Sequence, residues 1–163
     1  MEPCGDDRRM LLTPKALKDY ILEEFEGVNC VNSWGESSFF YNLNDRLPRG
    51  TYFCTLKEKD GDNDKGSDIN RVDVYRFNFG LPEKQFVELF GEKPKRPEKG
   101  QTIEGPWDFT ALNILMPHPI YGWMGWVATL NPTHESFSRI KPLLSLAYLK
   151  AVKGFEKRTN HKI

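Results

Sequence analysis

The C-terminal third of the chain contains the sequence feature that most limits the possible folds. From Thr133 onward, the segment "HESFSRIKPLLSLAYLKAVKGF" repeats apolar residues at the spacing of one helix face. These residues are Phe137, Ile140, Leu144, Ala147, Tyr148, Ala151 and Phe155. A helix with one apolar face needs another layer of structure to pack against. We expect Pro142 to kink this helix or to begin its second segment.

A second helix is predicted near the N-terminus, within "TPKALKDYILEEFEG" at 13–27. Thr13 is a suitable N-cap, and Pro14 occupies the first helical position, where a missing N–H is harmless. Gly27 is a plausible stop. One face of this helix carries Leu17, Tyr20, Ile21 and Phe25.

Short strands are predicted between these helices. The segments 28–34 and 37–42 are expected to form a hairpin around Gly35, and 51–56 is a further strand. The clearest strand is "VDVYRFNFG" at 72–80, in which polar Arg76 and Asn78 share one face. Two polar side chains late in an apolar strand either meet solvent or line a polar pocket.

The rest of the chain alternates short elements with loops. We expect a short helix at 82–91, a helix at 107–116 and a strand at 121–130, with long loops at 58–71 and 92–106. The sequence thus predicts an α+β fold with about five strands in a mostly antiparallel sheet, and with the N- and C-terminal helices packed on one face. A single domain is expected at 13–157, after a flexible N-terminus at 1–12 and before a frayed tail at 158–163.

Charge and composition limit the kinds of molecule that the protein is expected to bind and the compartment in which it is expected to function. The chain has 23 basic and 23 acidic residues, so its net charge is about zero, which argues against nucleic-acid binding and against an electrostatic membrane anchor. No apolar run is long enough to suggest a spanning helix, and the first residues do not resemble a secretory signal. Three cysteines, an odd number, fit a reducing compartment. We therefore expect a soluble cytoplasmic protein that is a monomer or a small homo-oligomer.

Three segments together resemble a known family. They are "SDINRVDVYRFNFG", "DFTALNILMPHPIYGWMGWVATLNPT" and "SFSRIKPLLSLAYLKAV", and "WGESSFFY" resembles the early hairpin of the same family. The chain resembles, from about Leu17 to about Val152, a bacterial family of unknown function with family number 6194. Its architecture is more distantly similar to the MmcQ/YjbR-like proteins, for which DNA binding has been suggested. The balanced charge does not support extending that suggestion to this chain. The resemblance implies a fold and supplies no catalytic residue.

The segment "MPHPIYGWMGW" at 116–126 has two interpretations. As a corner, it uses its prolines and glycines to turn the chain into a buried strand, with Trp126 in the core and His118 bonded to a backbone carbonyl. As a site, it offers His118 for hydrogen bonding or proton transfer, with Tyr121 and Trp123 among the walls. We favour the corner and keep the site as the alternative. A core Trp126 predicts that Trp126→Ala costs about 3–5 kcal/mol.

A second cluster lies around the strand at 72–80. Arg71 and Arg76 could clamp a carboxylate or phosphate through their forked donors. The simpler interpretation is an ion pair between Asp68 and Arg71 that holds the loop, with Arg76 exposed. If a ligand binds, we expect it to be anionic or to carry a polar planar group. The candidate binding residues are Arg71, Arg76, Asn78, His118, Tyr121 and Trp123.

Signatures of metal sites and of common enzymes are missing from the sequence. In "DGDNDKG" at 60–66, three aspartates alternate as in a calcium loop, but Lys65 stands where that loop needs glycine and Arg71 where it needs an acid. We expect a solvated loop tip there, and we assign no metal, no cofactor and no catalytic residue. The expected function is the binding of a small molecule or a protein partner. The alternative is an enzyme that combines His118 with Arg71 or Arg76.

Overall fold

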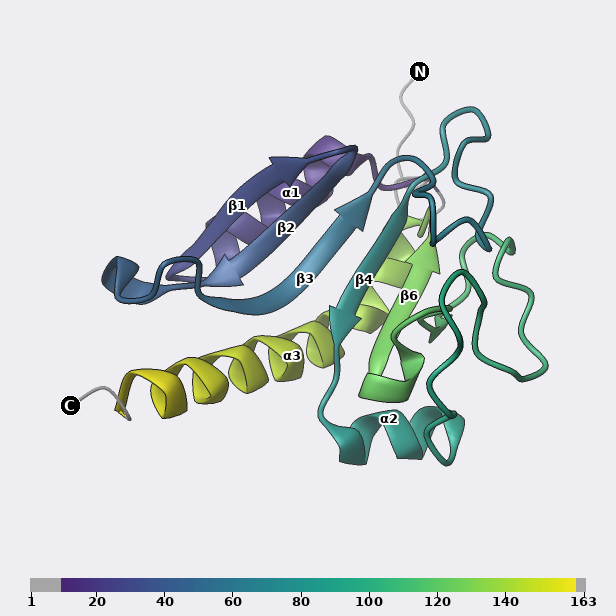
Figure 1. Ribbon diagram of the computed structural model, residues 1–163. Helices are drawn as coiled ribbons and strands as arrows, with labels where there is room; N and C mark the ends of the chain where they lie inside the picture. Colours follow the sequence, from purple (N-terminus) through teal and green to yellow (C-terminus); the bar gives the residue numbers. More distant parts are fainter. Residues whose placement is uncertain (1–9, 161–163) are drawn as a thin grey trace, which may run out of the picture.

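A computed structural model describes residues 10–160, which form a six-stranded sheet with three α-helices (Figure 1). All neighbouring strands are antiparallel, in the order β1-β2-β3-β4-β6-β5. Their bounds are Val28–Ser33 for β1, Glu36–Tyr41 for β2, Thr51–Lys57 for β3, Arg76–Gly80 for β4, Met116–Pro117 for β5 and Trp126–Leu130 for β6. The predicted α+β domain is confirmed, with six strands instead of about five.

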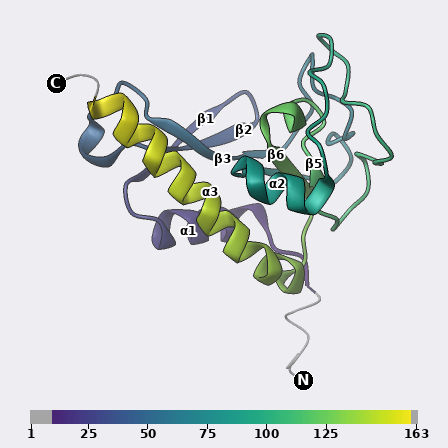
Figure 2. The same ribbon diagram turned by 90° about the horizontal axis from the view of Figure 1, so that it is seen from below.

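The N- and C-terminal helices lie on the same side of the sheet, as predicted (Figure 2). Helix α1 spans Pro14–Glu24, and the hydroxyl of Thr13 accepts a 3.1 Å hydrogen bond from the Ala16 amide as its N-cap. Helix α2 spans Glu83–Phe90, and α3 runs from His134 to Asn160 as one assigned helix that includes Pro142. None of the helices within residues 10–160 is both long and apolar enough to cross a membrane.

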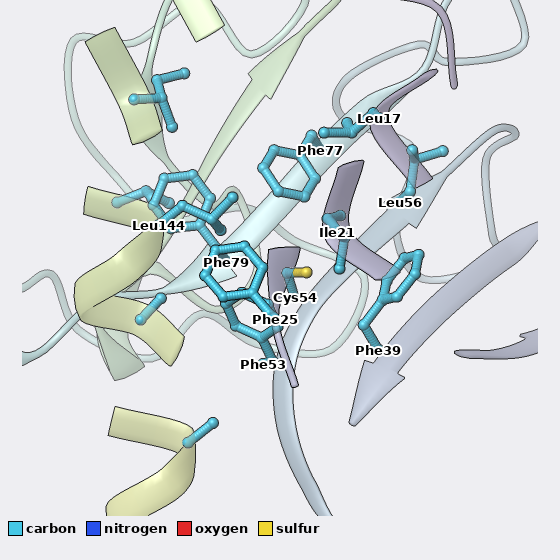
Figure 3. Close-up of a cluster of buried hydrophobic side chains, with 14 of the residues drawn as sticks. Leu17, Ile21, Phe25, Phe39, Phe53, Cys54, Leu56, Phe77, Phe79 and Leu144 are labelled. Atoms are coloured by element: carbon cyan, nitrogen blue, oxygen red, sulfur yellow. The ribbon is translucent and has the colours of Figure 1, made fainter. Parts of the chain in front are cut away.

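The main hydrophobic core fills the space between these helices and one face of the sheet (Figure 3). Side chains alternate between the two faces of a strand. The core face therefore carries Phe39 of β2, Cys54 and Leu56 of β3, and Phe77 and Phe79 of β4, all fully buried. The helices contribute Leu17, Ile21 and Leu144, also fully buried. Aromatic rings make up much of this core, as the composition suggests.

No α-helix within residues 10–160 covers the opposite face of the sheet, which carries polar side chains (Figure 2). Thr55 on β3 pairs with Asn78 on β4, and Lys57 pairs with Arg76 two residues along the same two strands. Because these residues alternate with the core residues, their side chains point away from α1 and α3. We call this side of the sheet the helix-free face.

The predicted hairpin is confirmed, because β1 and β2 pair around a turn at Trp34 and Gly35. Both turn residues have positive φ, 53° and 78°, as a tight two-residue hairpin turn requires. Trp34 is 89% exposed at the tip.

Three predicted elements are wrong in extent or type. Strand β6 begins at Trp126, not at residue 121, because residues 122–124 form a 3-10 helix. Strand β4 begins at Arg76, not at residue 72, because Asp73 adopts a left-handed φ of 59° that interrupts an extended chain. Residues 107–115 form turns and not a helix. Here Asn113 has a left-handed φ of 60°, and its amide donates to the carbonyl of Leu130 in β6. That contact replaces the bond that a helix would make within itself.

Residues at both ends of the described chain contact the rest of the fold. Leu12 is buried, and its carbonyl accepts a hydrogen bond from the hydroxyl of Tyr75. At the other end, residues 158–160 continue α3, and Thr159 is buried. Residues 1–9 of the predicted flexible N-terminus and 161–163 of the predicted tail lie outside the described residues.

Candidate functional site

The helix-free face forms the floor of a cavity of about 790 Å³. Strands β2 and β3 supply part of the floor, and segments 61–64, 96–100 and 118–126 supply the walls. The polar lining residues that matter most are Glu36, Ser38, Thr55, Lys57, Asp64 and His118. The aromatic lining residues are Tyr52, Tyr121, Trp123 and Trp126. A concave space with aromatic walls and a few grouped polar side chains is typical of a small-molecule site.

Arg76 lies fully buried at the start of β4 and organises the polar cluster behind the cavity. Its guanidinium forms a two-pronged ion pair with Asp64, in which Nη1 lies 3.0 Å from Oδ1 and Nη2 binds Oδ2. Nε donates to the Asn78 amide oxygen at 2.8 Å, and Nη1 also donates to the Ser67 hydroxyl at 3.0 Å. The Asn78 amide nitrogen then donates to Thr55 at 2.9 Å. A buried arginine with this many partners is held in a single orientation.

His118 directly follows β5 and is 3% exposed. Its amide donates to the carbonyl of Trp126 and continues the pairing between β5 and β6. Its ring nitrogen Nδ1 accepts hydrogen bonds from the amides of Ile120 and Tyr121, both at 3.0 Å. The other ring nitrogen, Nε2, lies 3.3 Å from Nη2 of Arg76. The prolines around His118 thus create a turn whose free amides fix the imidazole.

The surroundings of His118 keep its imidazole neutral. Burial, together with the positive charges of Arg76 and Lys57, lowers the pKa of His118 well below its ordinary value. Lys57 at the end of β3 is itself only 9% exposed. The inner part of the cavity is therefore a site of positive charge with a neutral histidine at its edge.

The aromatic walls are built by close backbone packing. Trp126 stands on β6 opposite Gly80 of β4, and its indole lies directly over that glycine. A Cβ atom at residue 80 would lie 2.9 Å from the indole nitrogen, so only glycine leaves room for the ring. Tyr52 meets Trp126 edge-on at 6.3 Å between ring centroids. On the other wall, the guanidinium of Arg96 lies 4.9 Å from the ring centre of Trp123.

Comparison with known proteins places the chain in a family. Residues 12–160 match the family of unknown function DUF6194. The chain belongs to this family. No curated protein and no solved structure gives a significant match. The resemblance seen in the sequence is thus confirmed for DUF6194, and the function has to be argued from the site itself.

The structure brings together most of the candidate residues in this DUF6194 chain. Arg76 donates a hydrogen bond to Asn78 and lies 3.3 Å from Nε2 of His118, and His118, Tyr121 and Trp123 line the cavity. Tyr121 packs beside His118 with 5.0 Å between ring centroids. The side chain of Arg76 lies behind the cavity wall, where it is buried and not exposed as the simpler interpretation has it.

Arg71 takes a structural part away from the cavity lining. Its guanidinium donates to the carbonyls of Asp68, Ser67 and Thr110, at 2.8, 3.1 and 2.9 Å. The carboxylate of Asp68 is more distant, 3.8 Å from Nε of Arg71. Arg71 therefore holds the loop to residue 110 mainly through backbone carbonyls, and it forms no clamp with Arg76.

The segment 116–126 is both a corner and a wall of the cavity. Pro119 and Gly122 are buried in the turn, as the corner interpretation predicts. Nδ1 of His118, however, accepts from backbone amides instead of the ring donating to a carbonyl. The prediction that Trp126 belongs to the core is wrong, because its indole is only partly buried and lines the cavity. Gly80 on the neighbouring strand is what allows this position.

The sequence gives only weak signals for the remaining cavity residues. Lys57 and Thr55 alternate with Cys54 and Leu56, so their placement on the opposite face follows from the strand pattern. Asp64 lies in the segment that resembles a calcium loop, and its carboxylate binds Arg76 instead. Asp60 accepts from the Ile69 amide at 2.8 Å. These two carboxylates thus bind groups of the protein itself.

Proposed function

We propose that this protein binds a small molecule in the cavity on the helix-free face, and that the ligand is anionic or carries a polar planar group. The single observation that supports this most is the cavity of about 790 Å³, in which four aromatic side chains surround buried polar groups. Its volume is within the range of ligand sites in proteins. A polar cluster fixed by Arg76 supports the same function, because its hydrogen bonds hold the lining side chains in place before any ligand arrives.

The geometry favours binding over catalysis. Nδ1 of His118 is occupied by two backbone amides, and the low pKa of the ring keeps it from accepting a proton near neutral pH. Arg71 is engaged with carbonyls and does not reach toward His118 through any hydrogen bond in the described chain. These contacts suit a histidine that donates one hydrogen bond from a fixed position.

We do not extend to this chain the DNA binding suggested for the MmcQ/YjbR-like proteins. The 23 basic residues are balanced by 23 acidic ones. The cavity is also lined by charges of both signs, with Glu36, Asp64 and Glu98 beside Lys57 and Arg96. Duplex DNA binding needs a surface of one sign, and the cavity does not offer one.

Thermal-shift screening against carboxylates, phosphates and nucleotides tests the proposal. A compound at about 100 times its Kd adds about 2.7 kcal/mol to the free energy of unfolding, which raises the Tm by about 5–11 °C for a chain of this size. Tyr121→Ala should weaken binding, because Tyr121 lines the cavity and is 48% exposed. Trp34→Ala is the matched control, since Trp34 is an exposed aromatic residue outside the cavity. Equal binding by both variants would place the ligand elsewhere.

A further inference from the structure

The hydrogen bonds of His118 determine which ring nitrogen carries its proton. Nδ1 lies 3.0 Å from two backbone amides, whereas Nε2 lies 3.3 Å from one guanidinium nitrogen, so the two shorter contacts assign Nδ1 as the acceptor without a proton. A neutral imidazole then carries its proton on Nε2. The neighbour of Nε2 is Nη2 of Arg76, which is also a donor and cannot accept that proton. Across residues 10–160, no acceptor is hydrogen-bonded to Nε2, although the side chain is 3% exposed.

Lys57 presents a second buried donor without a partner. It lines the same cavity, is 9% exposed, and forms no ion pair or side-chain hydrogen bond with any residue the structure describes. Glu36 stands opposite Lys57 in the pairing of β2 and β3, yet the two make no ion pair. Arg76 stands opposite Lys57 on its other side. A buried ammonium group without an anion is costly, so this arrangement favours an anion from outside the chain.

The charges of the inner cluster support the same conclusion. Lys57 and Arg76 contribute two positive charges, Asp64 contributes one negative charge, and His118 is neutral. Glu36 lines the same cavity opposite Lys57 but forms no ion pair with it, so the charge of Lys57 has no direct partner among the described residues. Both carboxylate oxygens of Asp64 bind Arg76, and Asp64 forms no ion pair with Lys57.

We infer that the cavity takes an oxyanion, the carboxylate or phosphate group of its ligand, as an acceptor for Nε2 of His118 and Nζ of Lys57. This inference rests on the proposed function and specifies the group that the ligand presents to the inner cluster. Arg76 is a positioning residue here, which adds positive potential and leaves Nε2 without an internal acceptor. The aromatic rings of Tyr52 and Trp126 line the same cavity and suit a flat apolar remainder of the ligand.

The tautomer of His118 can be measured on the full chain without any ligand. Long-range ¹H–¹⁵N NMR spectra distinguish a protonated from an unprotonated ring nitrogen, and His118→Asn assigns the signal. We expect a neutral ring with the proton on Nε2, and a shift of Nε2 larger than that of Nδ1 when benzoate is added. A proton on Nδ1, or an Nε2 signal that benzoate and phenyl phosphate both leave unmoved, would overturn the inference.

Affinity measurements with charged and neutral probes separate this inference from the proposed function. Benzoate or phenyl phosphate should bind at least about tenfold more tightly than the neutral benzamide, because only the anions compensate the buried charge. Lys57→Met, which keeps the apolar stem, should reduce that ratio to about threefold or less, whereas Lys59→Met at an exposed position should keep it.

The two possible failures give different results. Benzamide that binds in the cavity as tightly as benzoate, with the same change in fluorescence of Trp126, would contradict the oxyanion inference and leave the proposed function standing. A full screen in which neither anionic nor neutral compounds change the Tm or the tryptophan fluorescence would contradict the proposed function itself.

Discussion

Substitution of Asp64 by asparagine tests whether the ion pair behind the cavity supports the fold. The side chain of Arg76 is 0% exposed and that of Asp64 is 19% exposed, so the guanidinium cannot exchange its partner for bulk water. Asparagine keeps the shape of the side chain but removes the negative charge and one of the two acceptor oxygens. The buried guanidinium is then left with uncompensated charge, although Asn78 and Ser67 still accept from it.

Breaking a buried ion pair in this way costs about 3–5 kcal/mol. For a chain of this size each kcal/mol lowers the Tm by about 2–4 °C, so Asp64→Asn should melt about 6–20 °C below the wild type. Differential scanning calorimetry measures the shift, and urea unfolding gives the free energy. Asp62→Asn is the control, since Asp62 is exposed on the same loop, and it should change stability by less than about 0.5 kcal/mol.

A double variant distinguishes lost charge compensation from a general disturbance of the loop. In Asp64→Asn combined with Arg76→Met, no uncompensated buried charge remains, so the loss should be smaller than the sum of the two single losses. Additive losses, or an Asp64→Asn variant that melts with Asp62→Asn, would refute the reasoning that Arg76 depends on Asp64.

Three further predictions follow from the core and the cavity. Below about pH 6.5 the unfolded chain binds a proton at His118 that the folded chain does not bind. The free energy of unfolding should therefore fall by up to about 1.4 kcal/mol for each unit by which the pH decreases. Urea unfolding measured between about pH 7 and pH 5.5 should give this slope for the wild type and a smaller slope for His118→Asn. Trp126→Ala should lower the free energy of unfolding by less than the 3–5 kcal/mol expected of a core tryptophan. The same variant should weaken the binding of any cavity ligand that thermal shift detects. Leu144→Ala, at a fully buried position on α3, should cost about 2–5 kcal/mol by urea unfolding and leave ligand affinity unchanged.

Helix caps and turn residues can be read from a few neighbouring positions, so the sequence predicts the elements that depend on them. Thr13 and Pro14 define the start of α1, and the turn at Gly35 defines the first hairpin. The helix at 107–116 is wrong because its apolar residues pack elsewhere: Phe109 and Met116 form a second small core with Ile103. A periodic apolar pattern does not reveal which part of the fold its residues pack against. Contacts with distant segments can therefore override the helix that the pattern predicts.

The candidate site could be predicted only in part, for a similar reason. The alternation around Phe77 places Arg76 and Asn78 on one face of the strand. The prolines, glycines and aromatic residues of 116–126 indicate His118 as a candidate site residue. What the sequence does not reveal is that β6 pairs beside β4 and carries β5 with it, which sets His118 next to Arg76. Arg71 is close to Arg76 in sequence, yet the irregular turns at 71–75 direct it to other partners.

The pairing of β4 with β6 has a kinetic consequence. Arg76 and His118 are 42 residues apart in the sequence, and the cavity is completed only when the segment between them has closed. Closing so long a segment lowers chain entropy before the contacts form, so the cavity is expected to assemble after the transition state for folding. A compound bound there should therefore slow unfolding and leave the folding rate unchanged. The lifetime of the native chain, more than the speed at which it is reached, would depend on occupancy of this cavity.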